Sequence, residues 1–105
     1  MKLNHLNAVI AFMMATAPAT AKETEFIEQA ALLGVYRDVC RQPVEDETIM
    51  ISIGSAMVQQ ALPRETVIAR ATKRDRHIRD YVLRSGTQNT FCEAFMYYLK
   101  NGYPK

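Results

Sequence analysis

The sequence has few of the side chains from which catalytic and metal sites are built. It contains two cysteines and two histidines. Of the two histidines, only His77 lies beyond the first 21 residues. A zinc site takes three or four cysteine, histidine or carboxylate ligands, which this chain does not supply convincingly. A nucleophile, a base and an orienting group at a recognisable spacing are also missing. We therefore predict a protein that is not an enzyme, with no catalytic residues, no metal site and no cofactor.

Long apolar runs are missing as well. Residues 8–17 form an uncharged stretch of ten residues, whereas a membrane-spanning helix needs about 20. Lys2 precedes this stretch, and Ala19-Thr20-Ala21 after it has the small-x-small pattern of a signal-peptidase site. The sequence therefore predicts a cleaved signal peptide over 1–21 and a single periplasmic or secreted domain over 22–105, without stable membrane insertion. The alternative is an amphipathic anchor helix that is retained.

The two cysteines, Cys40 and Cys92, are expected to form a disulfide. An even number of cysteines in an exported chain indicates pairing, because the compartment is oxidising. The alternative is a pair of buried thiols. Closing a loop of about 50 residues stabilises a fold by roughly 4 kcal/mol in the chain-entropy description. That is a large share of the total stability of so small a domain, roughly 5 kcal/mol.

Beyond the signal peptide, proline and glycine divide the chain into four segments with apolar residues at helical spacing. We predict helices over residues 24–40, 46–62, 64–84 and 91–100. The last is expected to begin with a capping box at Thr90 and Glu93. The tyrosine-rich tail over residues 97–105 forms either a second binding surface, with Tyr97 and Tyr103 exposed, or a cover for the core.

The second segment is the ambiguous one. Ile49, Ile51 and Ile53 alternate as they would in a strand, and Gly54 weakens a helix by about 1 kcal/mol. We favour a helix, because one short strand would have no partner. Cys40 ends the first helix and Cys92 begins the fourth, each on an apolar face. The predicted fold is therefore all-α, a small four-helix domain in which one disulfide joins the first and last helices side by side.

Charge is balanced overall but unevenly distributed. Residues 22–47 contain three basic and seven acidic side chains, and residues 64–84 contain seven basic and three acidic ones. One arc of the third helix is therefore cationic, and we take it as the candidate partner-binding surface. Its members are Arg70, Lys73, Arg74, His77, Tyr81 and Arg84. The alternative is that these charges are solvated and partly paired within the helix, as Asp75 with Arg79 at i,i+4.

These features favour a non-catalytic binding protein of the cell envelope. The expected partner is another envelope or secreted protein, or an anionic envelope component. Nucleic acid is not expected, because export separates the chain from most of it. At the level of plan (exported, short, helical, one disulfide) the chain loosely resembles the periplasmic acid-stress chaperones, which implies a chaperone as one alternative. A secreted inhibitor or immunity protein is another, since rigid scaffolds lose little entropy on binding.

Overall fold

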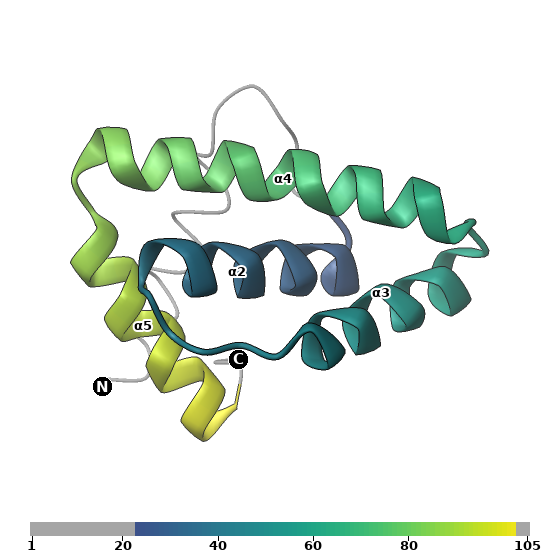
Figure 1. The fold of residues 1–105 in the computed structure, drawn as a ribbon, viewed down its shortest axis with the longest axis horizontal. Helices are drawn as coiled ribbons and strands as arrows, with labels where there is room; N and C mark the ends of the chain where they lie inside the picture. The colour runs from purple at the N-terminus through teal and green to yellow at the C-terminus, as the bar shows by residue number, and fades with distance from the viewer. Residues whose placement is uncertain (1–22, 103–105) are drawn as a thin grey trace.

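The computed structural model describes residues 23–102, and within that range the chain forms four α-helices and no strand (Figure 1). The helices are α2 (Glu25–Val39), α3 (Asp46–Gln60), α4 (Arg64–Ser85) and α5 (Gln88–Asn101). The predicted all-α, four-helix architecture is confirmed. The predicted signal peptide lies outside the described residues. None of the four helices has the length and apolar character that crossing a membrane requires.

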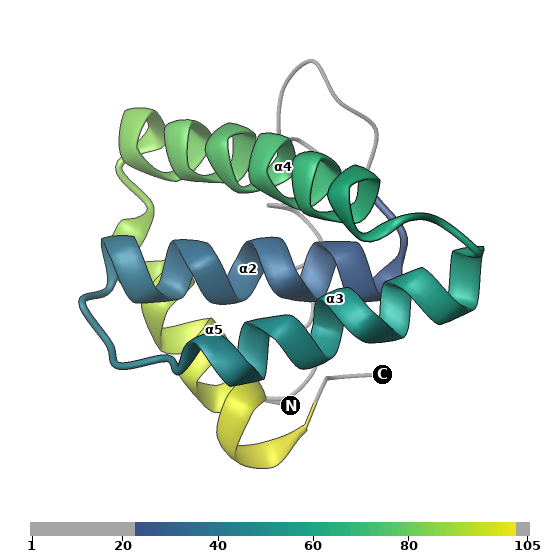
Figure 2. The ribbon, with the colours of Figure 1, turned by 45° about the vertical axis from the view of Figure 1, so that its right-hand side comes forward.

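Helix α2 lies at the centre of the domain, with α4 along one side and α3 and α5 on the other (Figure 2). The seven consecutive residues from Ala30 to Tyr36 are all buried. A helix that is covered on several sides is apolar around most of its circumference, rather than along a single stripe. The composition of α2 reflects this position, because its middle is built from alanine, leucine, glycine and valine.

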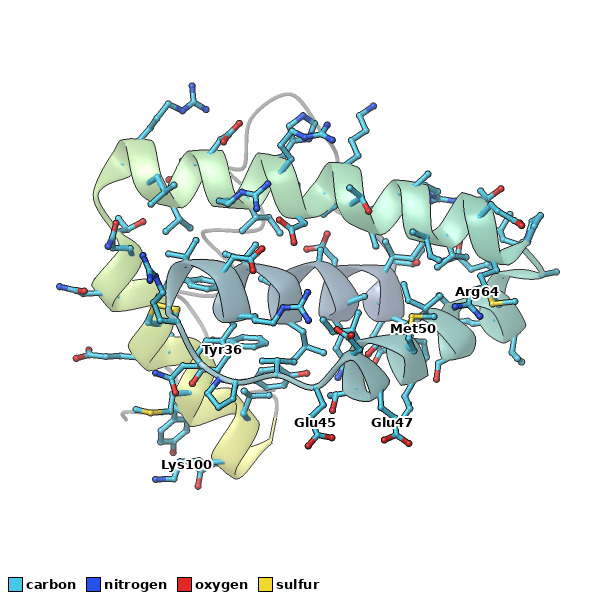
Figure 3. The ribbon with its side chains drawn as sticks, in the orientation of Figure 1. Tyr36, Glu45, Glu47, Met50, Arg64 and Lys100 are labelled. Atoms are coloured by element: carbon cyan, nitrogen blue, oxygen red, sulfur yellow. A yellow bond between two sulfur atoms is a disulfide. The ribbon has the colours of Figure 1, made fainter. Side chains whose placement is uncertain are left out.

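The core has two parts, one at each end of α2. The N-terminal half of α2 packs against α3 and α4, where Ile27, Ile53 and Val67 are buried. The C-terminal half packs against α4 and α5, where the ring of Tyr36 meets that of Phe95, with centroids 5.1 Å apart (Figure 3). Helix α5 therefore joins the domain through this second part of the core.

The disulfide between Cys40 and Cys92 is confirmed, with the two Cα atoms 5.8 Å apart. Both cysteines are partly buried against the part of the core that α5 shares with α2. The bond joins the first and last of the four helices, as predicted. Helix α5 is steeply inclined to α2, however, and does not run alongside it (Figure 1). The bond therefore pins the start of α5 to the end of α2, and the aromatic rings hold the rest.

Helix α4 approaches α2 closely at Gly34. A Cβ atom placed on Gly34 would overlap the carboxylate of Asp75 on α4. Glycine is the one residue that leaves room for this carboxylate at the crossing, which explains why a residue of low helix propensity occupies the middle of α2.

Two local expectations about the helices have different outcomes. The second segment forms a helix and not a strand, and this helix ends at Gln60, where the following residue, Ala61, takes a left-handed conformation with φ 53°. Helix α5 begins at Gln88, three residues before the predicted start, so Thr90 lies inside the helix and does not cap it. The expected capping box was wrong, because Gly86 ends α4 with φ 71° and one further residue is enough to start the next helix.

The end of α5 covers the core. Tyr98 is partly buried, its ring lies 5.0 Å from that of Phe95, and its hydroxyl accepts a hydrogen bond of 3.0 Å from the Gln29 side chain. Of the two tyrosines suggested as exposed, Tyr97 is partly buried, and Tyr103 lies outside the described residues. Within the described range, the tail behaves as a cover for the core.

Candidate binding surface on helix α4

The six residues of the predicted cationic arc divide into an inner and an outer group. Arg70 and Arg74 turn toward α2. The Arg74 side chain is fully buried, with its Nε 2.5 Å from Glu28 Oε1. Arg70 is partly exposed, and its Nη2 lies 2.7 Å from Glu23 Oε1. One carboxylate in the first turns of α2 and one just before the helix thus hold two guanidinium groups of α4.

Arg74 therefore lies in the interior and not on the surface to which the sequence assigned it. Its helical position explains this placement, because it is three residues after Ala71 and four before Ile78, both of which are buried. The charge at this buried position is tolerated because Glu28, itself buried, pairs with it. The position of Arg74 relative to the buried residues of its helix could be read from the sequence. Which carboxylate of another helix pairs with its guanidinium could not.

The outer group is exposed to solvent. Lys73 and Arg84 are exposed, and so is Arg76, which the sequence analysis did not include in the candidate surface. We call these three residues the outer cationic surface. Within residues 23–102, no carboxylate oxygen lies within 4.0 Å of any of their charged nitrogens. His77 and Tyr81 are partly buried at the edge of this surface, and Tyr81 packs against the core.

Other charges of the two polarised segments pair with each other. Arg79 Nη1 lies 3.4 Å from Asp38 Oδ2 and 3.5 Å from Asp75 Oδ1. The first contact joins α4 to the end of α2, and the second is the i,i+4 pair expected from the sequence. Arg37 on α2 also holds Asp46 at the beginning of α3, at 2.8 Å. The acidic and basic segments thus neutralise each other where they touch, whereas Lys73, Arg76 and Arg84 form no ion pair with a described residue, although the exposed Asp80 lies between Arg76 and Arg84 in the sequence.

Asp75 is the carboxylate with the most unusual surroundings. It lies over Gly34 on the wall of a cavity of about 180 Å³ between α2, α3 and α4. Most of the cavity wall is apolar, and Arg37 and Thr72 also line it. Burial raises the pKa of Asp75 above its ordinary value, and the nearby Arg79 opposes that shift only in part.

We expect Asp75→Asn to raise the free energy of unfolding at pH 7. Because the folded-state pKa of Asp75 is raised above 3.8, the ionised carboxylate is less favourable in the folded chain than in the unfolded one. The stabilisation from the protonated group is complete below that ordinary value and is lost as pH rises through the raised pKa. Asparagine does not ionise, so the advantage of the variant over the native chain should be largest at neutral pH.

Urea denaturation at pH 3 and pH 7 measures this difference. Asp80→Asn, an exposed change on the same helix, is the matched control. An Asp75→Asn effect of the same size at both pH values would contradict the assignment.

Among residues 23–102, no group of three or more histidine, cysteine and acidic side chains could hold a metal ion. Both cysteines are consumed by the disulfide, so neither is a thiol nucleophile. No protein-family model, curated protein or solved structure matches this chain.

Proposed function

We propose that residues 22–105 form a non-catalytic binding module of the cell envelope, and that the outer cationic surface binds an anionic partner. One observation carries this proposal. The cations of α4 that face α2, such as Arg70 and Arg74, are paired with carboxylates. The three cations of the outer cationic surface have no such partner within the described residues. A protein that pairs its inner cations and leaves Lys73, Arg76 and Arg84 exposed on one arc of α4 has charge available for a ligand. The exposed Asp80, at i,i+4 from both Arg76 and Arg84, reduces the net charge of that arc without forming an ion pair with either.

The chemistry of the surface favours carboxylate or phosphate groups. Arg76 and Arg84 can each donate two parallel hydrogen bonds to such a group, and Lys73 adds a point charge. A surface with a net positive charge also raises the association rate with an anionic partner. We propose a protein or an anionic envelope component as the source of these groups. Periplasmic or secreted localisation is part of the proposal, and the disulfide is compatible with it.

The surface is also held rigidly. Helix α4 is bound to α2 by the Glu28–Arg74 ion pair and by the buried side chains between the two helices, and to the residues just before α2 by the Glu23–Arg70 ion pair. A surface that is ordered before binding loses less conformational entropy on association. The ion pairs therefore contribute to binding without touching the ligand.

Charge reversal tests the proposal. We expect the native protein to bind vesicles containing anionic phospholipid or an acidic polypeptide, and Lys73→Glu with Arg76→Glu to weaken that binding at least about tenfold, since two exposed charges change sign. Arg41→Glu with Lys100→Glu is the matched control, because both residues are exposed and neither is on α4. Binding is measured by cosedimentation at several salt concentrations.

Three results would count against this assignment. Equal losses in the two double variants would show a response to net charge and not to this surface. Binding that does not change with salt would exclude an electrostatic contact. Failure of the native protein to bind either probe would exclude both partner chemistries.

A further inference from the structure

The side of α3 that faces away from the core carries apolar residues that no described residue covers. Ile51 is 64% exposed and Val58 is 85% exposed. Gly54 and Ser55 lie between them, and the four positions share one helix face at spacings of three and four residues. We call Ile51, Gly54, Ser55 and Val58 the α3 stripe. Together with Phe26 and Gln59 they line a shallow hollow.

Gly54 makes room for no other part of the chain over residues 23–102. No heavy atom of those residues lies within 4 Å of the position that a Cβ would occupy on Gly54. A glycine inside a helix destabilises it by about 1 kcal/mol relative to alanine. Gly34 is explained by the carboxylate of Asp75, which a Cβ would overlap. Gly54 has no comparable neighbour, and its missing side chain leaves room for the close approach of a second helix.

The order of residue sizes along the stripe is the same in both directions. It reads large, small, small, large from Ile51 to Val58. When two copies of α3 pack antiparallel, Ile51 of each copy lies beside Val58 of the other, and the small residues meet at the crossing. A two-fold symmetric interface needs this kind of self-complementary surface.

Charge favours the same arrangement. Helix α3 carries Asp46 and Glu47 in its first turn and no basic residue in its last. Arg64 follows the other end of α3 after a short turn. Figure 3 shows Glu47 at the beginning of α3, pointing away from α4, and Arg64 beside its end. Antiparallel packing brings the acidic beginning of α3 in one copy close to Arg64, beside the end of α3, in the other copy. It also places the two helix dipoles in opposite directions, which is the favourable arrangement. Parallel packing would bring the acidic ends together.

We propose that the α3 stripe is the two-fold interface of an antiparallel homodimer. Stable interfaces bury about 1,200–2,000 Å² in total, and a single pair of short helices falls at or below the low end of that range. The dimer should therefore be weak and reversible, with a dissociation constant on the order of 10 µM. The stripe and the outer cationic surface lie on different helices, so each dimer would present two cationic surfaces. The proposal does not depend on the function of that surface.

Gly54→Leu is the sharpest test of the close approach. No described residue has an atom within 4 Å of the new Cβ, and leucine favours the helix, so the thermal midpoint should be unchanged or higher. The dimer should be lost, because leucine fills the space at the crossing. Sedimentation equilibrium of the purified protein between 1 and 200 µM measures both association states. Ala69→Leu, at an exposed position on α4, is the matched control and should dimerise like the native protein.

A charge swap tests the antiparallel orientation. Glu47→Arg and Arg64→Glu should each weaken the dimer at least about threefold, and the two changes together should restore it. A double variant weaker than both single variants would overturn the antiparallel arrangement. Native protein that stays monomeric at 200 µM, or Gly54→Leu protein that still dimerises, would overturn the homodimer. Crosslinks from Val58→Cys to residues 1–22 of the same chain would instead identify that segment as the occupant of the stripe.

Discussion

Replacing Cys40 and Cys92 together by alanine is expected to lower the free energy of unfolding by about 4 kcal/mol. The bond joins residues 52 positions apart, and in the chain-entropy description a loop of that length contributes about this amount. Native stabilities are roughly 0.05–0.15 kcal/mol per residue. The disulfide therefore supplies a large part of the stability of this domain. For a domain of this size the thermal midpoint should fall by about 20 °C.

Urea denaturation of the native protein, with and without a thiol reductant, and of the double alanine variant measures this loss. Reduced native protein and the variant should unfold at similar urea concentrations, and reductant should not affect the variant. Equal midpoints for the oxidised and reduced native protein would show that the aromatic contacts of α5 hold the domain closed without the bond.

The loss of stability should be concentrated in α5. This helix is attached through the disulfide and through the rings of Phe91, Phe95 and Tyr98, which pack on the C-terminal half of α2. Helices α3 and α4 have a second part of the core that does not involve α5. Hydrogen exchange of the reduced protein should therefore show greater loss of amide protection in α5 than in α4.

Helix limits were predictable where the chain carries local signals. Helices α2 and α4 match the predicted segments to within one residue at each end, because Pro43 and Gly86 stop a helix whatever surrounds it. The start of α5 has no such signal. Its first turn, Gln88–Thr90, contains only polar residues that are equally suited to a loop. Thr90 and Glu93 matched a capping pattern inside a helix that had already begun, so the pattern alone misplaced the boundary.

The surface of α4 was harder to predict than its limits. The sequence shows that Arg74 is three residues from Ala71 and four from Ile78, which favours burial, but its charge argued for solvent. The deciding residue, Glu28, belongs to another helix 46 residues away. No local pattern links the two. Arg76 was not placed on the predicted cationic arc, although its side chain is exposed.

The sequence analysis also left the α3 stripe undetected. Ile51 was considered only in the strand-like alternation with Ile49 and Ile53, and Val58 was assigned no role. Ile51 and Val58 lie on the side of α3 that faces away from the core. A count of the apolar residues outside the buried face would have revealed them. What the sequence does not give is the space around Gly54, which depends on how α2 and α3 cross.

Replacing Arg74 by methionine is expected to destabilise the domain by about 3–5 kcal/mol. Methionine has a similar length and no charge, so the change leaves Glu28 buried without its guanidinium partner. An uncompensated buried charge carries most of the expected penalty, because desolvation of the carboxylate is no longer offset by the ion pair. The backbone N–H of Glu23, which donates to Glu28 Oε1 at 3.0 Å, does not replace that partner.

Removing both charges should recover most of the loss. In Glu28→Met with Arg74→Met, two apolar side chains fill the site and neither charge is buried, so the double variant should be within about 1 kcal/mol of the native protein or more stable. The coupling free energy from a double-mutant cycle, measured by urea denaturation at pH 7, quantifies the pair.

Arg70→Met is the matched control for this cycle. Its pair with Glu23 is partly exposed, and solvent-exposed ion pairs contribute about 1 kcal/mol or less, so the control should change stability far less than Arg74→Met. A double Glu28 and Arg74 variant as unstable as the Arg74 variant alone would contradict this account, since it would show that the packing of the guanidinium, and not the charge of Glu28, accounts for the loss. In that case Arg74 would act as a large core residue that happens to be charged.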